Sequence, residues 1–425
     1  MIALLVGSLL GLLIIAVPVG FALGLSTLIV MIQQGTLPTE VIMQRGISGV
    51  GSFPMLALPL FILAGYLMEY GSTRRLMRFA NALLGRMPGG LAAAQVSAAA
   101  MFGAVSGSGI ATIAAVGGVF GPEMVKQKYP KGFIVSLMAA SGGLGVLIPP
   151  SIPLIIYGLI GNVSIGGLFF GTLVPGLVTV FLVIATAVLL SWKYGFGERH
   201  KANWKEIRQA FMSAIPPLLL PVIILGGIFS GVFTATESAA IAVLFALILA
   251  SMIYRELSWG QLYDALTKTA LISGTILIIL AMSAAFAWLV TISQFPALVG
   301  DWLQGISASE FVIFAIIQLI ILLLGVFIEA ISIIVITTPI FLPVIIGMGI
   351  DPIVYGVVLV LNCVIASMTP PVAVNIYVSA RMIRATPSEA NKWLFVFIAP
   401  LVVTALICML VPDVVLFLPR ILGAV

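Results

Sequence analysis

The chain has 425 residues, of which 62% are hydrophobic and only 8% are charged. This balance excludes an ordinary soluble domain, in which about a quarter of the residues carry charge. The net charge of +5 does not indicate nucleic-acid binding, because the basic residues are scattered over short loops. Apolar runs long enough to cross roughly 30 Å of hydrocarbon recur from end to end, so we predict an all-α polytopic membrane protein.

Residues 1–50 are predicted to form an N-terminal scaffold helix followed by a loop. The apolar run over 2–31 has no basic stretch before it and no small-residue cleavage site after it. We therefore expect a retained single crossing rather than a signal peptide, with a loop over 32–50.

A first repeat is predicted over residues 51–192. It opens with a crossing over 51–70. The segment 72–88 follows, with basic and apolar residues at helical spacing. This pattern is typical of an amphipathic helix lying at the membrane surface.

A re-entrant helical hairpin is expected over about 89–122, because the stretch Gly103 to Gly109 in its middle is a poor helix former. A broken helix is expected over about 132–162, interrupted at Pro149-Pro150.

Residues 193–268 are predicted to hold a basic cytoplasmic loop and a connecting helical pair over 211–253. Thr234 and Glu237 have the spacing of a capping box. In such a box the two residues bind each other's backbone N–H groups. They predict the start of a helix over 235–253.

A second repeat is predicted over residues 269–425, with a hairpin at about 310–348 and a broken helix at about 353–380. Ser108 precedes Pro149 by 41 residues, and Glu329 precedes Pro370 by the same 41 residues. The spacing of the first half thus recurs unchanged in the second half. Paired interruptions at corresponding positions of two halves indicate inverted-topology repeats around a binding site.

The loop charges predict an orientation. Cytoplasmic loops of membrane proteins are enriched in Lys and Arg. An arrangement with a cytoplasmic N-terminus and a periplasmic C-terminus places 17 of the 19 basic residues inside, leaving Arg45 and Arg420 outside. The two hairpins then enter the membrane from opposite faces.

The breaks have a chemistry of their own. Freed carbonyls and hydroxyls coordinate cations, and helix N-termini favour anions. The alternative is that the breaks are ordinary helix kinks and packing glycines without a binding role. Glu329 is the one acid at a predicted hairpin tip. Three roles are open for it: binding a cation, carrying a proton or capping a helix. Asn375 either contacts a polar substrate or bonds to a neighbouring helix.

An enzyme is not expected. The one histidine, His200, lies in a predicted loop, and the chain has no Walker A motif and no metal-ligand cluster. A passive channel is the alternative from another class, since inverted repeats also build channels.

Five motifs resemble the large membrane subunit of tripartite ATP-independent periplasmic (TRAP) transporters, within the wider ion transporter superfamily. They are SGSGIATIAAVG at 106–117, GLGVLIPPSIPLIIYG at 143–158, GVFTATESAA at 231–240, GIDPIVYG at 349–356 and TPPVAVNIYVSAR at 369–381. The resemblance implies an elevator mechanism in the bacterial inner membrane, with Na⁺ as coupling ion and no cofactor.

The resemblance also implies partners. They are a small membrane subunit, a periplasmic solute-binding protein, membrane lipid and an organic acid substrate such as a dicarboxylate or a sialic acid. A stand-alone Na⁺/carboxylate carrier that needs no binding protein is the alternative within transport.

Carried over by position, the resemblance implies two groups of cation-binding residues. The first group is Ser106, Ser108, Gly145 and Ile148, and the second is Ile328, Ser332, Ala366 and Thr369. The substrate is expected beside Ser108, Thr112, Pro149, Pro150, Glu329, Pro370 and Asn375. Many relatives have Asp at the positions of Thr112 and Glu329, a departure that bears on the detail of the substrate or ion site. An Ala also replaces the common Pro at position 235.

Overall fold

The computed structural model of the chain describes residues 1–35, 38–197, 203–307 and 309–423, and every regular element in these ranges is helical. Seven helices in the described residues are long and apolar enough to cross a membrane, or up to nine if each of two bent helix pairs is one span. This confirms the all-α membrane fold predicted from composition. His200 lies outside the described residues.

The helices are, in chain order, α1 (Ile2–Ile14), α2 (Val19–Gln34), α3 (Glu40–Val50), η1 (Phe53–Leu56), α4 (Ala57–Leu84), α5 (Gly90–Ser106), α6 (Gly109–Thr112), η2 (Ile113–Gly117), α7 (Gly118–Lys126), α8 (Lys131–Leu147), α9 (Ile152–Gly161), α10 (Ile165–Tyr194), α11 (Trp204–Phe229), α12 (Ala235–Leu247), η3 (Ile248–Ile253), α13 (Trp259–Ile292), α14 (Phe295–Ile306), α15 (Glu310–Gly325), α16 (Ala330–Gly347), α17 (Pro352–Met368), α18 (Val374–Met382), η4 (Pro387–Ala390), α19 (Asn391–Leu410) and α20 (Asp413–Ile421). The segments η2 and η3 are π-helical.

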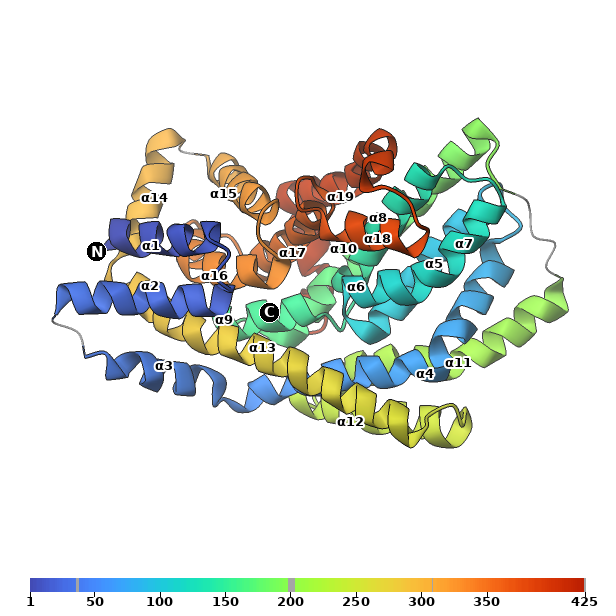
Figure 1. Cartoon of the computed structure of the whole chain (residues 1–425), viewed down its shortest axis with the longest axis horizontal. Helices are drawn as coiled ribbons and strands as arrows, with labels where there is room; N and C mark the ends of the chain where they lie inside the picture. The colour runs from blue at the N-terminus through green and yellow to red at the C-terminus, as the bar shows by residue number, and fades with distance from the viewer. Residues whose placement is uncertain (36–37, 198–202, 308, 424–425) are drawn as a thin grey trace.

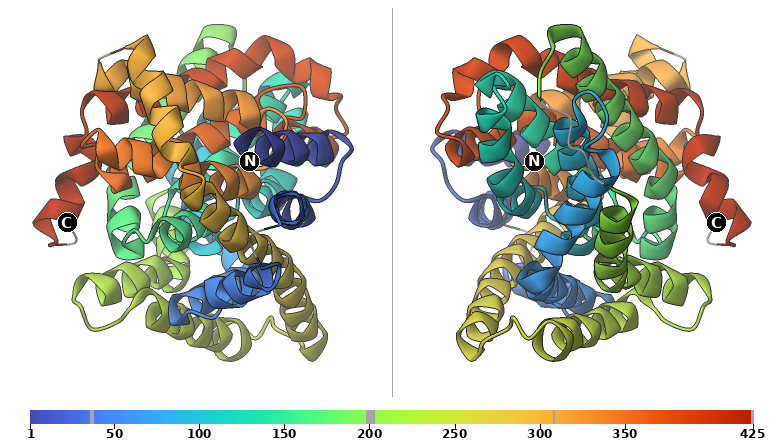
Figure 2. Two further views of the ribbon diagram at one scale, coloured as in Figure 1. Left: turned by 90° about the vertical axis from the view of Figure 1, so that its left-hand side faces the viewer. Right: turned by 90° about the vertical axis from the view of Figure 1, so that its right-hand side faces the viewer.

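Two layers of helices make up the molecule (Figures 1 and 2). One layer contains α3, α4, α11, α12 and α13. The other contains the elements that carry the sequence breaks, together with α10 and α19. The two layers meet where α4 packs on α5 and α13 packs on α16.

The N-terminal region departs from the prediction. α1 and α2 are separate helices that run antiparallel, so the N-terminus lies at the same end of the molecule as the end of α2 (Figure 1). Ala16 adopts a left-handed conformation with φ 62°, and Pro18 has no backbone N–H to continue the helical hydrogen bonds. The single crossing predicted over 2–31 is therefore wrong.

The loop predicted over 32–50 is also largely replaced by a helix. α3 packs along α13 on one side while α2 packs along α13 on another. Thus α2 and α3 pack on α13, and α1 packs on α2.

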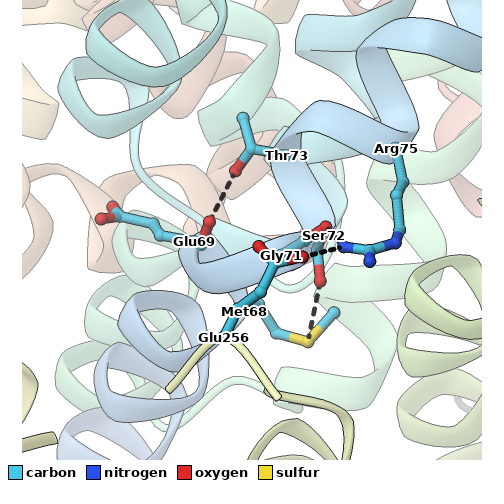
Figure 3. A network of polar contacts seen from close by, with 7 residues as sticks. All are labelled: Met68, Glu69, Gly71, Ser72, Thr73, Arg75 and Glu256. Atoms are coloured by element: carbon cyan, nitrogen blue, oxygen red, sulfur yellow. Dashed lines mark hydrogen bonds and ion pairs between the residues drawn. The ribbon is translucent and has the colours of Figure 1, made fainter. Parts of the chain in front are cut away.

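A kink in α4 separates the predicted crossing from the predicted amphipathic helix. Tyr70 and Gly71 leave the helical conformation, with φ 82° at Gly71. Figure 3 shows Arg75 reaching back to the Gly71 carbonyl, to which its guanidinium donates a hydrogen bond. Arg75 also forms an ion pair with Glu256 at 3.0 Å and lies 3.7 Å from the ring centre of Tyr254. Burial raises the pKa of the Tyr254 hydroxyl, so this ring stays neutral beneath the cation.

The predicted capping box is confirmed at the start of α12. The Thr234 N–H donates to Glu237 Oε2 at 2.8 Å, and the Glu237 N–H donates to Thr234 Oγ1 at 3.3 Å. The backbone N–H groups of Thr234 and Glu237 thus find hydrogen-bond partners within the first turn. Because these bonds are local, this helix start could be predicted from the sequence alone.

Helical hairpins and broken helices occupy the four segments that carry the breaks. α5 and α6–α7 form the first hairpin, and α15 and α16 form the second. α8 and α9 are bent by 44° across the first Pro-Pro step. α17 ends at Met368 and α18 begins at Val374, on either side of the second step.

Candidate functional site

Residues from all four breaks surround one cavity of about 230 Å³. The lining residues are Gly107, Ser108, Gly109, Ile110, Val146, Ile152, Pro153, Gly325, Ile328, Glu329, Ala330, Ile331, Cys363, Val364, Ala366, Ser367, Val372, Ala373, Val374 and Asn375. The structure therefore brings together segments from the two halves of the chain that lie far apart in sequence.

The first hairpin tip is closed by its own hydroxyl groups. The chain reverses at Gly107, whose φ of +62° suits glycine. The Thr112 hydroxyl donates to the Ser108 carbonyl at 2.8 Å, and Ser106 Oγ lies 3.3 Å from Thr112 Oγ1. Ser106 and Thr112 are buried behind the tip. Of the four residues, Gly107 and Ser108 line the cavity.

The first broken helix touches this tip directly. The Ile152 N–H, in the first turn of α9, donates to the Gly107 carbonyl at 3.4 Å. Gly145 in α8 has no room for a side chain, because a Cβ there would lie 2.3 Å from Thr112 Oγ1. The predicted residues Gly145, Ile148, Pro149 and Pro150 lie behind the cavity wall, which is formed instead by Val146, Ile152 and Pro153.

The second hairpin tip places a charge in the cavity. Glu329 precedes the first residue of α16, is exposed, and is the one charged side chain among the lining residues. The Ser332 hydroxyl donates to Glu329 Oε1 at 3.4 Å, while Ser332 itself is fully buried. Ile328 lines the cavity beside Glu329.

The second broken helix contributes Ala366 and Asn375 to the cavity. The Asn375 side-chain amide donates to Ser367 Oγ at 2.9 Å and to the Ala139 carbonyl at 3.5 Å. It therefore spans the break and also reaches α8. Thr369 and Pro370 lie outside the lining, and the Thr369 hydroxyl donates to the Ile365 carbonyl of its own helix at 2.8 Å.

Sequence reasoning missed Ser367 and Cys363. Both line the cavity on the last turns of α17. Ser367 lies two residues before Thr369, so its hydroxyl next to the break was the signal that could have identified it. Cys363 gave no such signal, because it lies several residues before the Pro-Pro step in a mostly apolar segment.

The ends of helices give the cavity its electrostatic character. The N-termini of α9, α16 and α18 open on it, and the positive ends of these helix dipoles favour an anion. The C-terminal turn of α17 lies beside them with carbonyls that favour a cation. The arrangement can hold ions of both signs side by side.

Comparison with known proteins gives a family match over nearly the whole chain. Residues 6–414 match the family model described as the tripartite ATP-independent periplasmic transporter, DctM component. The chain is 38% identical over 407 residues to the isethionate TRAP transporter permease protein DctMQ of Oleidesulfovibrio alaskensis. That match covers 95% of this chain and 64% of the relative, so the chain spans slightly less than two thirds of that protein's length.

A second relative matches over most of both chains. The sialic acid TRAP transporter large permease protein SiaM of Vibrio cholerae is 34% identical over 412 residues, covering 97% of this chain and 96% of the relative. Among solved structures, the YdaH transporter of Alcanivorax borkumensis superposes with a TM-score of 0.56 at 16% identity, covering 88% and 86% of the two chains. At this identity the likeness concerns the fold alone.

Proposed function

Because this chain belongs to the DctM component family of tripartite ATP-independent periplasmic transporters, we propose that it carries out Na⁺-coupled uptake of a small organic acid. The molecule is an integral membrane protein with several membrane-spanning helices, and we assign it to the bacterial inner membrane as a transporter rather than an enzyme. The convergence of all four chain breaks on one cavity supports this proposal most strongly.

Two cation sites lie at the breaks in this proposal. One uses the first tip around Ser106 and Ser108 with the backbone near Gly145 and Ile148. Its support is the close approach of the Ser106 and Thr112 hydroxyls and the Ser108 carbonyl. The other uses the second tip near Ile328 and Ser332 with the end of α17 at Ala366 and Thr369. Carbonyl and hydroxyl oxygens of this kind suit Na⁺.

The substrate occupies the cavity between the tips. Ser108, Glu329 and Asn375 are the predicted substrate residues whose positions support direct contact, because all three line the cavity. Thr112, Pro149, Pro150 and Pro370 act through the shape of the tips and breaks. The relatives' names mention isethionate and sialic acid, both small organic anions, and an anion fits the three helix N-termini.

The two break-bearing segments form inverted repeats that move together as an elevator. Each has a hairpin, then a helix broken at a Pro-Pro step, then a long helix. α4 and α13 belong to the stationary scaffold. A small membrane subunit steadies this scaffold, and a periplasmic binding protein delivers the substrate.

The face that carries the basic loops is cytoplasmic in this proposal. Figure 1 shows the N-terminus at the opposite end of the molecule from α7, which ends at Lys126, and from the start of α11, which contains Lys205. Since α1 and α2 do not add up to a crossing, we place the N-terminus outside, in the periplasm, while the other loops keep their predicted sides.

Cysteine labelling tests this orientation. A cysteine at Lys126 should react only with reagent inside the cell, and one at Asp351 only from outside. An N-terminal tag should be reached from outside. A tag that is protected in intact cells and becomes accessible after permeabilisation would show that the N-terminus is cytoplasmic.

Transport itself is tested in proteoliposomes that contain this chain and its small subunit. Uptake should require the loaded binding protein and an inward Na⁺ gradient, and it should accumulate substrate against its gradient. A membrane potential adds about 2.3 kcal/mol per charge per 100 mV to that drive.

Each alternative has its own result in this assay. Uptake that is unchanged when choline replaces Na⁺ excludes Na⁺ coupling. Robust Na⁺-driven uptake of free substrate without binding protein favours a stand-alone carrier. Equilibration without accumulation favours a passive channel.

A further inference from the structure

Each hairpin is tied to a broken helix by a buried side-chain amide. In the first pair, the Gln95 amide on α5 donates to Ser141 Oγ on α8 at 3.3 Å, and the two residues are 1% and 2% exposed. In the second pair, the Asn362 amide on α17 donates to Gln318 Oε1 on α15 at 2.6 Å and to the Gln318 carbonyl at 3.1 Å.

The two ties occupy equivalent places. Ser141 and Asn362 are separated along the chain by the same interval as the two Pro-Pro steps, so they are equivalent positions of the two halves. Gln95 and Gln318 both lie on the first arm of their hairpins. A polar tie therefore recurs at the same point of both hairpin and broken-helix pairs.

Close backbone packing reinforces each tie. A Cβ at Gly103 in α5 would lie 2.4 Å from the Cα of Gly145 in α8, and a Cβ at Gly325 in α15 would lie 2.5 Å from the Cβ of Ala366 in α17. The hairpin arms thus touch the broken helices with nothing larger than the Ala366 methyl group between them.

Opening a hairpin away from its broken helix carries a specific cost. Gln95 Oε1 and Gln318 Nε2 already have no hydrogen-bond partner among the described residues. Separation would also free Gln95 Nε2, Gln318 Oε1 and the Asn362 amide in apolar surroundings, where an unsatisfied polar group is strongly unfavourable. The Ser141 hydroxyl would keep its hydrogen bond to the Met138 carbonyl at 3.2 Å.

The two pairs are also tied to each other. The Tyr157 hydroxyl on α9 donates to the Pro352 carbonyl at the start of α17 at 2.6 Å. The Asn375 amide on α18 donates to the Ala139 carbonyl on α8. These contacts join both hairpins and both broken helices into one unit.

We propose that Gln95 and Gln318 are positioning residues that clamp each hairpin to its broken helix, so that neither hairpin opens as a gate. The cavity then reaches either face of the membrane by movement of the whole unit against α4 and α13. This inference rests on the proposed elevator function, and it specifies which parts of the moving unit stay fixed relative to one another.

Reversible cross-linking tests the proposal. Two paired variants are made in a background in which the native Cys363 and Cys408 are replaced by alanine: Gln95→Cys with Ser141→Cys, and Gln318→Cys with Asn362→Cys. A short bifunctional thiol reagent joins each pair, and thiol titration measures the joined fraction. The joined proteins should transport at least as fast as their reduced forms, because the link replaces the lost clamp.

A matched pair reports on movement between the layers. The Ser283 hydroxyl on α13 donates to the Val335 carbonyl on α16 at 3.3 Å, so Ser283→Cys with Val335→Cys joins the scaffold to the second hairpin. This link should lower uptake by at least about tenfold and reduction should restore it. A tenfold loss on joining either hairpin to its broken helix, reversed by reduction, overturns the proposal.

Distance measurements between spin labels separate this proposal from the proposed function. Leu319 on α15, Tyr377 on α18 and Leu266 on α13 are 55%, 50% and 47% exposed and accept labels. The Leu319–Tyr377 distance should not change with Na⁺, and the Leu319–Leu266 distance should shift. A Na⁺-dependent Leu319–Tyr377 distance contradicts the clamp even if no substrate is transported. Absence of Na⁺-dependent uptake by the parent protein refutes the proposed function instead.

Discussion

The two hairpin tips have the same place in the fold but different chemistry. The first tip is made of small hydroxyl residues that bond to one another, and Ser106 and Thr112 are buried behind it. The second tip places an exposed carboxylate, Glu329, in the cavity. In the proposed function the first tip surrounds a small cation with oxygens, whereas the second supplies the cavity's charge.

The packing behind the two tips also differs between the halves. At the first break a glycine, Gly145, allows α8 to approach Thr112. The equivalent position of the second half is Ala366, which already carries a Cβ and faces Gly325 across the contact. In the first half both the hairpin (Gly103) and the broken helix (Gly145) have a glycine at this contact, whereas in the second half only the hairpin has one (Gly325). Corresponding substitutions should therefore have unequal effects.

Glu329→Gln should give the largest effect. It removes the one charge that lines the cavity while keeping the side chain's size, so uptake should fall by about 100-fold, equivalent to about 2.7 kcal/mol. Initial uptake rates in proteoliposomes measure it. Glu329→Asp is the matched control and should keep substantial activity. Equal losses for both variants would show that side-chain length, not charge, is what matters.

Gly145→Val should disturb the first tip more than the corresponding substitution disturbs the second. Its Cβ would collide with Thr112 Oγ1 and lie 3.0 Å from the Ser108 carbonyl. Overpacking of this kind costs about 1–3 kcal/mol, so the melting temperature and the apparent Na⁺ affinity should both fall.

Ala366→Val is the comparison for Gly145→Val in the other half. It adds bulk where a Cβ is already accommodated, so its effect should be smaller. Equal effects of the two valines would remove the proposed difference between the halves.

Ser106→Ala and Thr369→Ala test the hydroxyls of the two sites. Loss of a buried polar contact costs about 1–3 kcal/mol, so Ser106→Ala should weaken Na⁺ activation of uptake without preventing folding. Thr369→Ala should do less, because the Thr369 hydroxyl bonds to its own helix. Na⁺ titration of uptake measures both. Unchanged titrations for both variants would mean that these side chains are structural.

Thr234→Ala should have the smallest effect on transport. It removes one half of the capping box of α12, in the scaffold layer, at a cost of about 1 kcal/mol to stability. Thermal unfolding in detergent should register the loss while Na⁺ activation stays at the parent value. A changed Na⁺ activation would show that α12 contributes to the ion sites.

Much of this protein follows from local sequence. Helix breaks are local events, because Pro lacks an N–H and Gly tolerates turns. For this reason the reversal at Gly107, the interruptions at Pro149-Pro150 and Pro370-Pro371 and the start of α12 could be predicted from the residues themselves. Long apolar runs likewise predict spans, since each is matched to the thickness of hydrocarbon.

The tertiary structure decided which side chains face the cavity. Ser108 and Ser367 line the cavity, whereas Ser106 and Ser332 are buried behind the cavity wall. Each of these serines lies near a break in the sequence, and only the rotation and packing of the helices distinguish them. The N-terminal region makes the same point, because a continuous apolar run predicted one crossing where α1 and α2 are antiparallel and α2 packs on α13. Hydropathy records how apolar a segment is, whereas the direction of the chain after a break depends on the helices against which it packs.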